Sequence, residues 1–243
     1  LAATIYGSAS WQAAGAIGPA LRFTGNNNDD IELGSAISLA GPAYTVSAWF
    51  KNLQPSGPNK WRTLARGSVL ASGDHLVIVE DISTRLGVYG NAAGGQFRDS
   101  GYSLNPPLNE WHFISAVATG NVTKMYVDGV YRGVCDRKSS WDLFCIGNFQ
   151  GVGSHDGDQK WSEYMDEFRL DLAGRSSNWV WAAYMNAATN DLFNGYGAVT
   201  AMDLNRPAVN NAGGATAITL TSATLHGALT STGTSATAVF VLW

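Results

Sequence analysis

The stretch "WHFISAVATGNVTKMYVDGVYRG", residues 111–133, decides the fold class of this chain. Together with the two residues that follow it, the stretch holds three runs rich in β-branched and aromatic residues, at 111–120, 122–129 and 130–135. Asp128-Gly129 is a two-residue turn signal, because glycine readily takes the positive φ that tight hairpins require. The stretch therefore predicts a β-hairpin within a series of short strands.

Similar short runs recur along the chain and are separated by Gly, Asn, Asp or Pro. They lie at 20–25, 30–34, 44–53, 62–67, 75–81, 85–90, 143–149 and 164–172. Many short strands at close spacing are typical of an antiparallel sandwich and not of an α/β fold. The sequence therefore predicts an all-β protein built from two sheets.

One segment has helical spacing instead. In "RSSNWVWAAYMNAATN" (175–190), Ser176 and Ser177 are candidate N-caps, and apolar residues follow at intervals of three and four. We predict a single short helix over about 176–188 that packs on the edge of the sandwich.

The composition changes after residue 200. Residues 207–243 carry almost no charge and alternate Thr or Ser with apolar residues, which suggests two strands around 218–229 and a third at 238–242. Roughly three strands cannot close a sandwich alone. We therefore expect one domain at 1–200, followed at 201–243 by a linker and a truncated second β domain. Its open edge would be able to pair with another chain.

Charge and hydropathy exclude two classes of partner. The net charge is −4 with no basic run, which excludes the phosphate-neutralising surface of a nucleic-acid binder. No apolar run approaches the ~20 residues that span a bilayer, so we expect no membrane insertion. The start at Leu1 and the end at "AVFVLW" suggest an excised or mature fragment.

Two cysteines, Cys135 and Cys145, lie at the inner ends of apolar runs that flank a polar loop. They are either two buried thiols or a disulfide across a hairpin. We expect the disulfide, which implies an oxidising compartment and so a secreted or cell-surface protein.

Several segments in order resemble the laminin-G-like, concanavalin A-like jelly-roll domain of bacterial multidomain proteins. They are "GAIGPALRFTGNNNDDIELG", "YTVSAWFK", "WRTLARG", "LNEWHFISAVATGNVTKMYVDGVYRG", "CIGNF" and "YMDEFRLDLAGRSSNWVWAAYMN". The resemblance implies a lectin- or glucanase-like sandwich over 1–200. The tail "ATAITLTSATLHGALTSTGTSATAVFVLW" resembles the first half of a fibronectin-III or immunoglobulin-like repeat.

The acidic run "EYMDEFRLDLAGRS" (163–176) raises the question of catalysis. Period-2 alternation places Glu167, Arg169 and Asp171 on one face, where opposite charges pair as an exposed stripe. A glycosidase needs two carboxylates that flank a cleft. We therefore expect no catalytic residues and no enzyme, and we place a glycoside hydrolase of the concanavalin-like group last.

The same alternation places Asp166 on the apolar face, where an unpartnered carboxylate is costly. Its partners would be backbone N–H groups of the N-terminal loop, or a structural calcium ion shared with Asn26 and Asp29 of "TGNNNDD". Relatives usually carry Asp where this chain has Thr24, which weakens the implied calcium site.

Aromatic residues in or beside polar loops are candidates for sugar stacking, and these are Trp61, Tyr102, Trp141 and Trp161. We expect a non-catalytic, extracellular, carbohydrate-binding module of a larger bacterial protein. The alternative is a structural or adhesive module whose partner is another surface protein.

Overall fold

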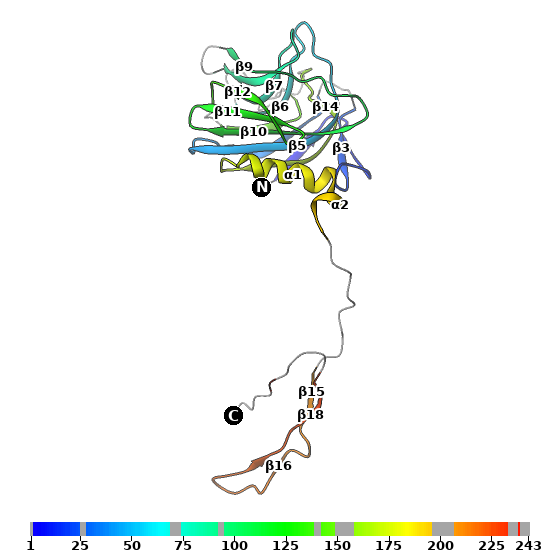
Figure 1. The fold of residues 1–243 in the computed structure, drawn as a ribbon, viewed down its shortest axis with the longest axis vertical. Helices are drawn as coiled ribbons and strands as arrows, with labels where there is room; N and C mark the ends of the chain where they lie inside the picture. The colour runs from blue at the N-terminus through cyan, green and yellow to red at the C-terminus, as the bar shows by residue number, and fades with distance from the viewer. Residues whose placement is uncertain are drawn as a thin grey trace. The chain divides into compact units, whose positions relative to one another are not determined.

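The computed structural model describes residues 2–24, 28–68, 74–91, 95–138, 142–148, 158–195, 207–232 and 238. The chain divides into two compact units, Leu1–Asn194 and Gly195–Trp243. The first unit is a sandwich of two seven-stranded antiparallel sheets, which confirms the predicted fold class (Figure 1).

The first sheet contains the buried arginines, Arg62 and Arg66, and the buried His75. Its order is β1 (Ala3–Tyr6), β4 (Asp30–Ser38), β13 (Asp142–Ile146), β6 (Arg62–Arg66), β7 (His75–Val79), β8 (Arg85–Gly90) and β9 (Gln96–Ser103). Neither β1 nor β9 was predicted. The run "QFRDSGYS" of β9 mixes charged and small residues without clear alternation, so its pairing with β8 is a tertiary effect.

The second sheet contains the predicted hairpin. Its order is β12 (Val130–Cys135), β11 (Val122–Val127), β10 (Trp111–Thr119), β5 (Ala43–Leu53), β14 (Ser162–Asp171), β3 (Ala20–Arg22) and β2 (Ser10–Gln12). Asp128 and Gly129 have φ of 52° and 73°, and Val127 pairs with Val130 across them. Positive φ at both central residues is the geometry of a tight hairpin turn, so that prediction is confirmed.

The main core lies between the sheets. It is filled by large side chains that water does not reach, among them Phe23, Tyr44, Phe50, Leu64 and Trp161. Burying one large apolar side chain stabilises a fold by roughly 1.5–3 kcal/mol, so this layer is the main source of stability.

The predicted helix is confirmed as α1 (Ser177–Ala188), and a short α2 (Asn190–Phe193) follows it. The Ser176 hydroxyl accepts the Trp179 N–H at 3.2 Å, as expected of an N-cap. The predicted position on the sandwich edge is wrong. Val180 and Tyr184 of α1 pack on Trp49 and Phe113, so the helix covers the outer face of the second sheet (Figure 1).

A β-bulge interrupts β14 and overturns the predicted alternation of faces. The pairing register with β5 shifts between Asp166 and Arg169, and Glu167 has φ of 48°. An extra residue in one strand reverses the faces beyond it. Met165 and Phe168 therefore both pack on the main core. Asp166 pairs with Trp49, whose side chain lies under α1, and so belongs to the outer face.

The predicted disulfide is wrong. Cys135 ends β12 in the second sheet, Cys145 lies within β13 in the first sheet, and both are buried free thiols. The two cysteines belong to strands of different sheets, so the segment between them does not close a hairpin. Burial raises the pKa of Cys135 to about 12.

The second unit has little regular structure in its described part. β15 (Ala208–Asn210) pairs with β18 (Ala228–Ser231), and β16 (Ala215–Thr216) pairs with β17 (Thr224–Leu225). Most of the predicted strand at 238–242 lies outside the described residues, and the immunoglobulin-like repeat stays a prediction. Among the helices that the structure describes, none is long and apolar enough to cross a membrane.

Candidate functional site

An aromatic cluster lies beside the first sheet. Trp61 directly precedes β6, and its ring meets Tyr89 of β8 edge-on with a centroid distance of 5.2 Å. Phe97 of β9 meets the same ring at 5.6 Å and pairs with Tyr89 in the sheet. All three side chains are half-buried. Edge-on contacts on two sides hold the Trp61 indole in one orientation without burying it.

Polar groups lie next to these rings. The Thr63 hydroxyl donates to Oε1 of Gln159 at 3.0 Å, and it also lies 3.0 Å from Nδ1 of His75. A hydroxyl has one hydrogen, so Nδ1 of His75 is the donor in the second bond. Burial, with Arg66 as the second cause, holds the pKa of His75 well below its ordinary value. The imidazole is therefore neutral at pH 7.

Together these residues line a cavity of about 160 Å³, formed by Trp61, His75, Ile78, Tyr89, Asn91 and Gln159. Two aromatic rings stand beside two side-chain amides, and the described lining carries no carboxylate. Such a cavity suits an uncharged polar ligand that has one apolar face.

The backbone of Gln159 is anchored on both sides. Its N–H donates to Oδ1 of Asn148 at 2.9 Å, and its carbonyl accepts the Thr63 N–H at 2.8 Å. These bonds join the Gln159 backbone to β6 and to Asn148, just after the end of β13, and so fix the position from which the Gln159 amide enters the cavity.

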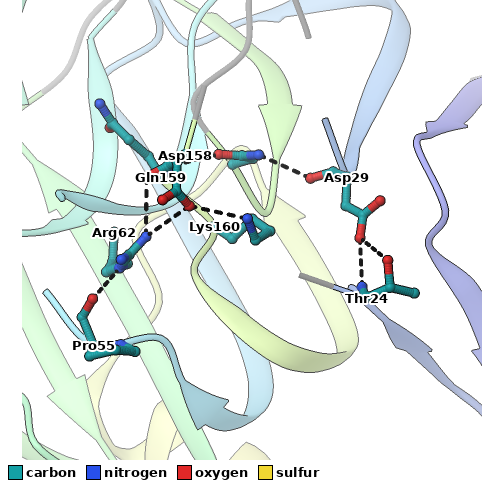
Figure 2. Close-up of polar contacts among 8 residues, drawn as sticks. Thr24, Asp29, Pro55, Arg62, Asp158, Gln159 and Lys160 are labelled. Carbon is teal, nitrogen blue, oxygen red and sulfur yellow. Dashed lines mark hydrogen bonds and ion pairs between the residues drawn. The ribbon is translucent and has the colours of Figure 1, made fainter. Parts of the chain in front are cut away.

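A buried charge network supports the same segment, as Figure 2 shows. The Arg62 guanidinium lies 3.2 Å from the Asp158 carbonyl and 2.7 Å from the Pro55 carbonyl. Lys160 Nζ lies 3.1 Å from the Asp158 carboxylate. Burial alone would raise the pKa of Asp158, but Lys160 and Arg62 outweigh it, and the pKa is lowered. Asp158 thus stays ionised and holds two cations below the cavity wall.

The four aromatic residues predicted to bind a ligand have different environments in the structure. Trp61 lines the cavity, whereas Trp161 is 0% exposed and packs edge-on against Phe50 in the core, so its prediction as a ligand platform is wrong. Tyr102 is half-buried, packs on the core, and has the Arg132 guanidinium 5.1 Å above its ring. It lies outside the set that lines the cavity. Trp141 falls outside the described residues.

The two predicted calcium ligands that the structure describes both have N–H partners. Asp29 accepts the Ser8 N–H at 2.6 Å as well as the N–H and hydroxyl of Thr24, and Figure 2 shows the Thr24 contacts. Asp166 accepts the N–H groups of Ile17 and Glu167, both at 2.8 Å. Asn26 lies outside the described residues. The described part of the chain holds no cluster of three or more His, Cys, Asp or Glu side chains fit for a metal. Calcium stays a prediction.

Four residues that line the cavity were not predicted from the sequence as site residues, and these are His75, Tyr89, Asn91 and Gln159. Alternation within 75–79 and 85–90 would have placed His75 and Tyr89 on strands. It did not indicate that β7 and β8 are neighbours of the segment around Gln159, which is distant in the sequence. Only the sheet order brings them together.

Comparisons with known proteins agree with this architecture. The model of a family described as the concanavalin A-like lectin/glucanases superfamily (Laminin_G_3) matches residues 24–173. No curated protein sequence matches the chain.

Similar solved structures include domain 4 of AbnA, an extracellular arabinanase from Geobacillus stearothermophilus, in complex with arabinotriose. It is 15% identical with a TM-score of 0.56, and the match covers 74% of this chain and 86% of that one. The botulinum neurotoxin serotype G binding domain is 12% identical with a TM-score of 0.54, over 77% of this chain and 47% of that one. At these identities the likeness shows the fold alone.

Proposed function

Because the chain belongs to the concanavalin A-like lectin/glucanases superfamily, we propose that it is a non-catalytic carbohydrate-binding module of an extracellular protein. The observation that carries the proposal is the cavity beside Trp61. Sugar rings have apolar C–H faces that stack on indole and phenol rings, and hydroxyl groups that bond to amides. Trp61, Tyr89 and Gln159 supply both kinds of contact within one cavity.

The size of the cavity suits a small number of sugar units. Its volume of about 160 Å³ is below the range of roughly 300–1,000 Å³ that drug-sized ligands need. We infer that one ring of a glycan enters the cavity and that neighbouring rings stay outside it.

The lining of the cavity supports binding without hydrolysis. A glycosidase of this kind needs two carboxylates on either side of the scissile bond. The described lining offers two aromatic rings, two amides and a neutral imidazole. These groups orient a sugar but supply neither a carboxylate nucleophile nor a carboxylic acid.

The printed descriptions of two similar structures are consistent with this role. The arabinanase domain is described as extracellular and in complex with arabinotriose, and the neurotoxin fragment is described as a binding domain. For the second unit, the Thr/Ser and apolar alternation of 207–243 supports a segment like part of an immunoglobulin-like repeat.

The test is a glycan array followed by calorimetric titration of the best ligand. Trp61→Ala should weaken binding at least about tenfold, because each 1.4 kcal/mol is a factor of ten in affinity. Trp181→Ala is the matched control, since Trp181 is 46% exposed and lies on α1. Absence of any glycan ligand, or equal loss in both variants, would overturn the proposal.

A further inference from the structure

A second and larger cavity lies at the other edge of the sandwich, where β1 and β2 are the outermost strands. Its volume is about 790 Å³, and its walls are mainly apolar. Ala3, Ile5 and Ile31 contribute from the first sheet, and Trp11, Leu21 and Phe168 from the second. The cavity therefore continues the space between the sheets out to the surface.

Apolar groups at this cavity are unusually exposed. Trp11 is 67% exposed, and Ile5 and Ile17 are 38% and 40% exposed. Isolated exposed apolar residues are common, but three that line one cavity form a continuous surface that favours burial by a ligand.

The strand that forms one wall of this cavity has a free backbone edge. β14 pairs with β5 as far as Asp171, but on its other side it pairs with β3 only at Tyr164 and Met165. Within the described residues, no strand pairs with Glu167–Asp171 on that side. Alternate N–H and C=O groups of that segment therefore point away from β5 without a strand partner.

The local sequence explains why β3 stops there. Pro19 precedes β3 and has no N–H to donate, and Gly18 has φ of 76°, so the chain turns away. Just before this turn, Ile17 donates its N–H to the Asp166 side chain. Among the residues that the structure describes, this turn leaves a five-residue stretch of the β14 edge without a strand partner, and five residues is the usual length of a strand.

We propose that this edge and cavity receive an extended segment of a partner polypeptide with apolar side chains at alternate positions. Its backbone would extend the second sheet along Glu167–Asp171. Its apolar side chains would enter the cavity beside Phe168, because alternate residues of a strand point to one face. A small apolar molecule would fill the cavity but would leave the backbone edge unpaired.

The experiment uses the purified chain and two synthetic peptides. The first is an eight-residue peptide with valine at alternate positions and threonine between them. The second has the same side chains, but its backbone nitrogens are methylated on the edge that would face β14. Binding is followed by Trp fluorescence and by hydrogen exchange with mass spectrometry.

We expect the first peptide to bind and to slow exchange within 167–171, and the methylated peptide to bind at least about tenfold more weakly, because it cannot form the backbone ladder. Ile5→Asp should weaken binding by a similar factor, since it places a charge in the cavity. Ile82→Asp should not, because Ile82 is 82% exposed and does not line the cavity. Thermal melting of both variants checks that they fold.

Three results would overturn the proposal. If the two peptides bind equally well, the cavity accepts any apolar ligand and the backbone edge has no role. The proposal also fails if neither peptide binds, or if the chain dimerises by itself and Ile5→Asp abolishes the dimer, because the occupant is then a second copy. None of these outcomes involves Trp61, so the proposed glycan site is tested separately.

Discussion

The backbone N–H of Ile17 donates to Oδ2 of Asp166 at 2.8 Å and joins positions 149 residues apart. The other oxygen, Oδ1, accepts the N–H of Glu167 at the bulge, also at 2.8 Å. One buried carboxylate thus holds the N-terminal loop against β14. A methyl group at Gly15 would lie 2.4 Å from the same Oδ2, which shows how closely the loop approaches.

Asp166→Asn should destabilise the protein by about 1–3 kcal/mol, because an amide replaces a charged acceptor of two N–H groups and leaves one of them poorly satisfied. Asp171→Asn is the control. Asp171 pairs with the solvent-exposed Arg175, and exposed ion pairs contribute little to stability. Urea unfolding followed by fluorescence measures both changes, and equal effects would remove the special role of Asp166.

Chelation should leave the melting temperature unchanged within about a degree. The described carboxylates Asp29 and Asp166 already accept N–H donors, whereas calcium requires six to eight oxygen ligands. The measurement is a thermal melt in EGTA, in added calcium and in neither. A fall in EGTA of several degrees that calcium reverses would instead establish the calcium site that the sequence suggests.

Both cysteines should resist alkylation in the native state. Burial raises the pKa of Cys135 to about 12, so the reactive thiolate is scarce at pH 8, and Cys145 is also buried. Iodoacetamide should add nothing to the folded protein and two groups after unfolding in guanidinium without reductant. If mass spectrometry finds no alkylation of the unfolded protein until a reductant is added, the two cysteines form a disulfide after all.

His112 should contribute stability below neutral pH. Its Nδ1 lies 2.9 Å from the Asp128 carboxylate, and this hydrogen bond raises the pKa of His112 despite partial burial. A raised pKa in the folded state gives stability that is fully present below the unfolded value of about 6.5. That stability is lost as the pH rises through the folded pKa.

Asp128→Asn isolates this effect, because asparagine tolerates the positive φ of the turn. The difference in unfolding free energy between the wild type and the variant should shrink from pH 5 to pH 8. Nuclear magnetic resonance titration should show a lower His112 pKa in the variant. A constant difference across this range would mean that the turn and not the histidine accounts for the effect.

Local signals were sufficient for most elements of the fold. Turn chemistry at Asp128-Gly129, the cap at Ser176 and short apolar runs located most strands and the helix correctly. These local signals failed at β14, where we predicted that side chains alternate between the two faces of the strand without interruption at Glu167. A bulge depends on how the strand pairs with β5, and no residue type in the run marks it.

Trp61 and Trp161 both lie beside polar loops, but only Trp61 lines a cavity, and its role in binding stays a prediction. Trp61 packs against Tyr89 and Phe97 of the first sheet and stays half-buried, whereas Trp161 is fully buried in the core between the sheets. The loop context of the two residues is the same in sequence. Their exposure depends on which strands lie beside them.

The sequence by itself determined the all-β sandwich, its hairpin and its helix. These follow from local conformational preference and composition. Tertiary structure alone decided that the cysteines lie in different sheets, that Asp166 lies on the outer face, and that Gln159 joins Trp61 in one cavity. The physical reason is that strand order and register arise from long-range pairing, which residues near in sequence do not specify.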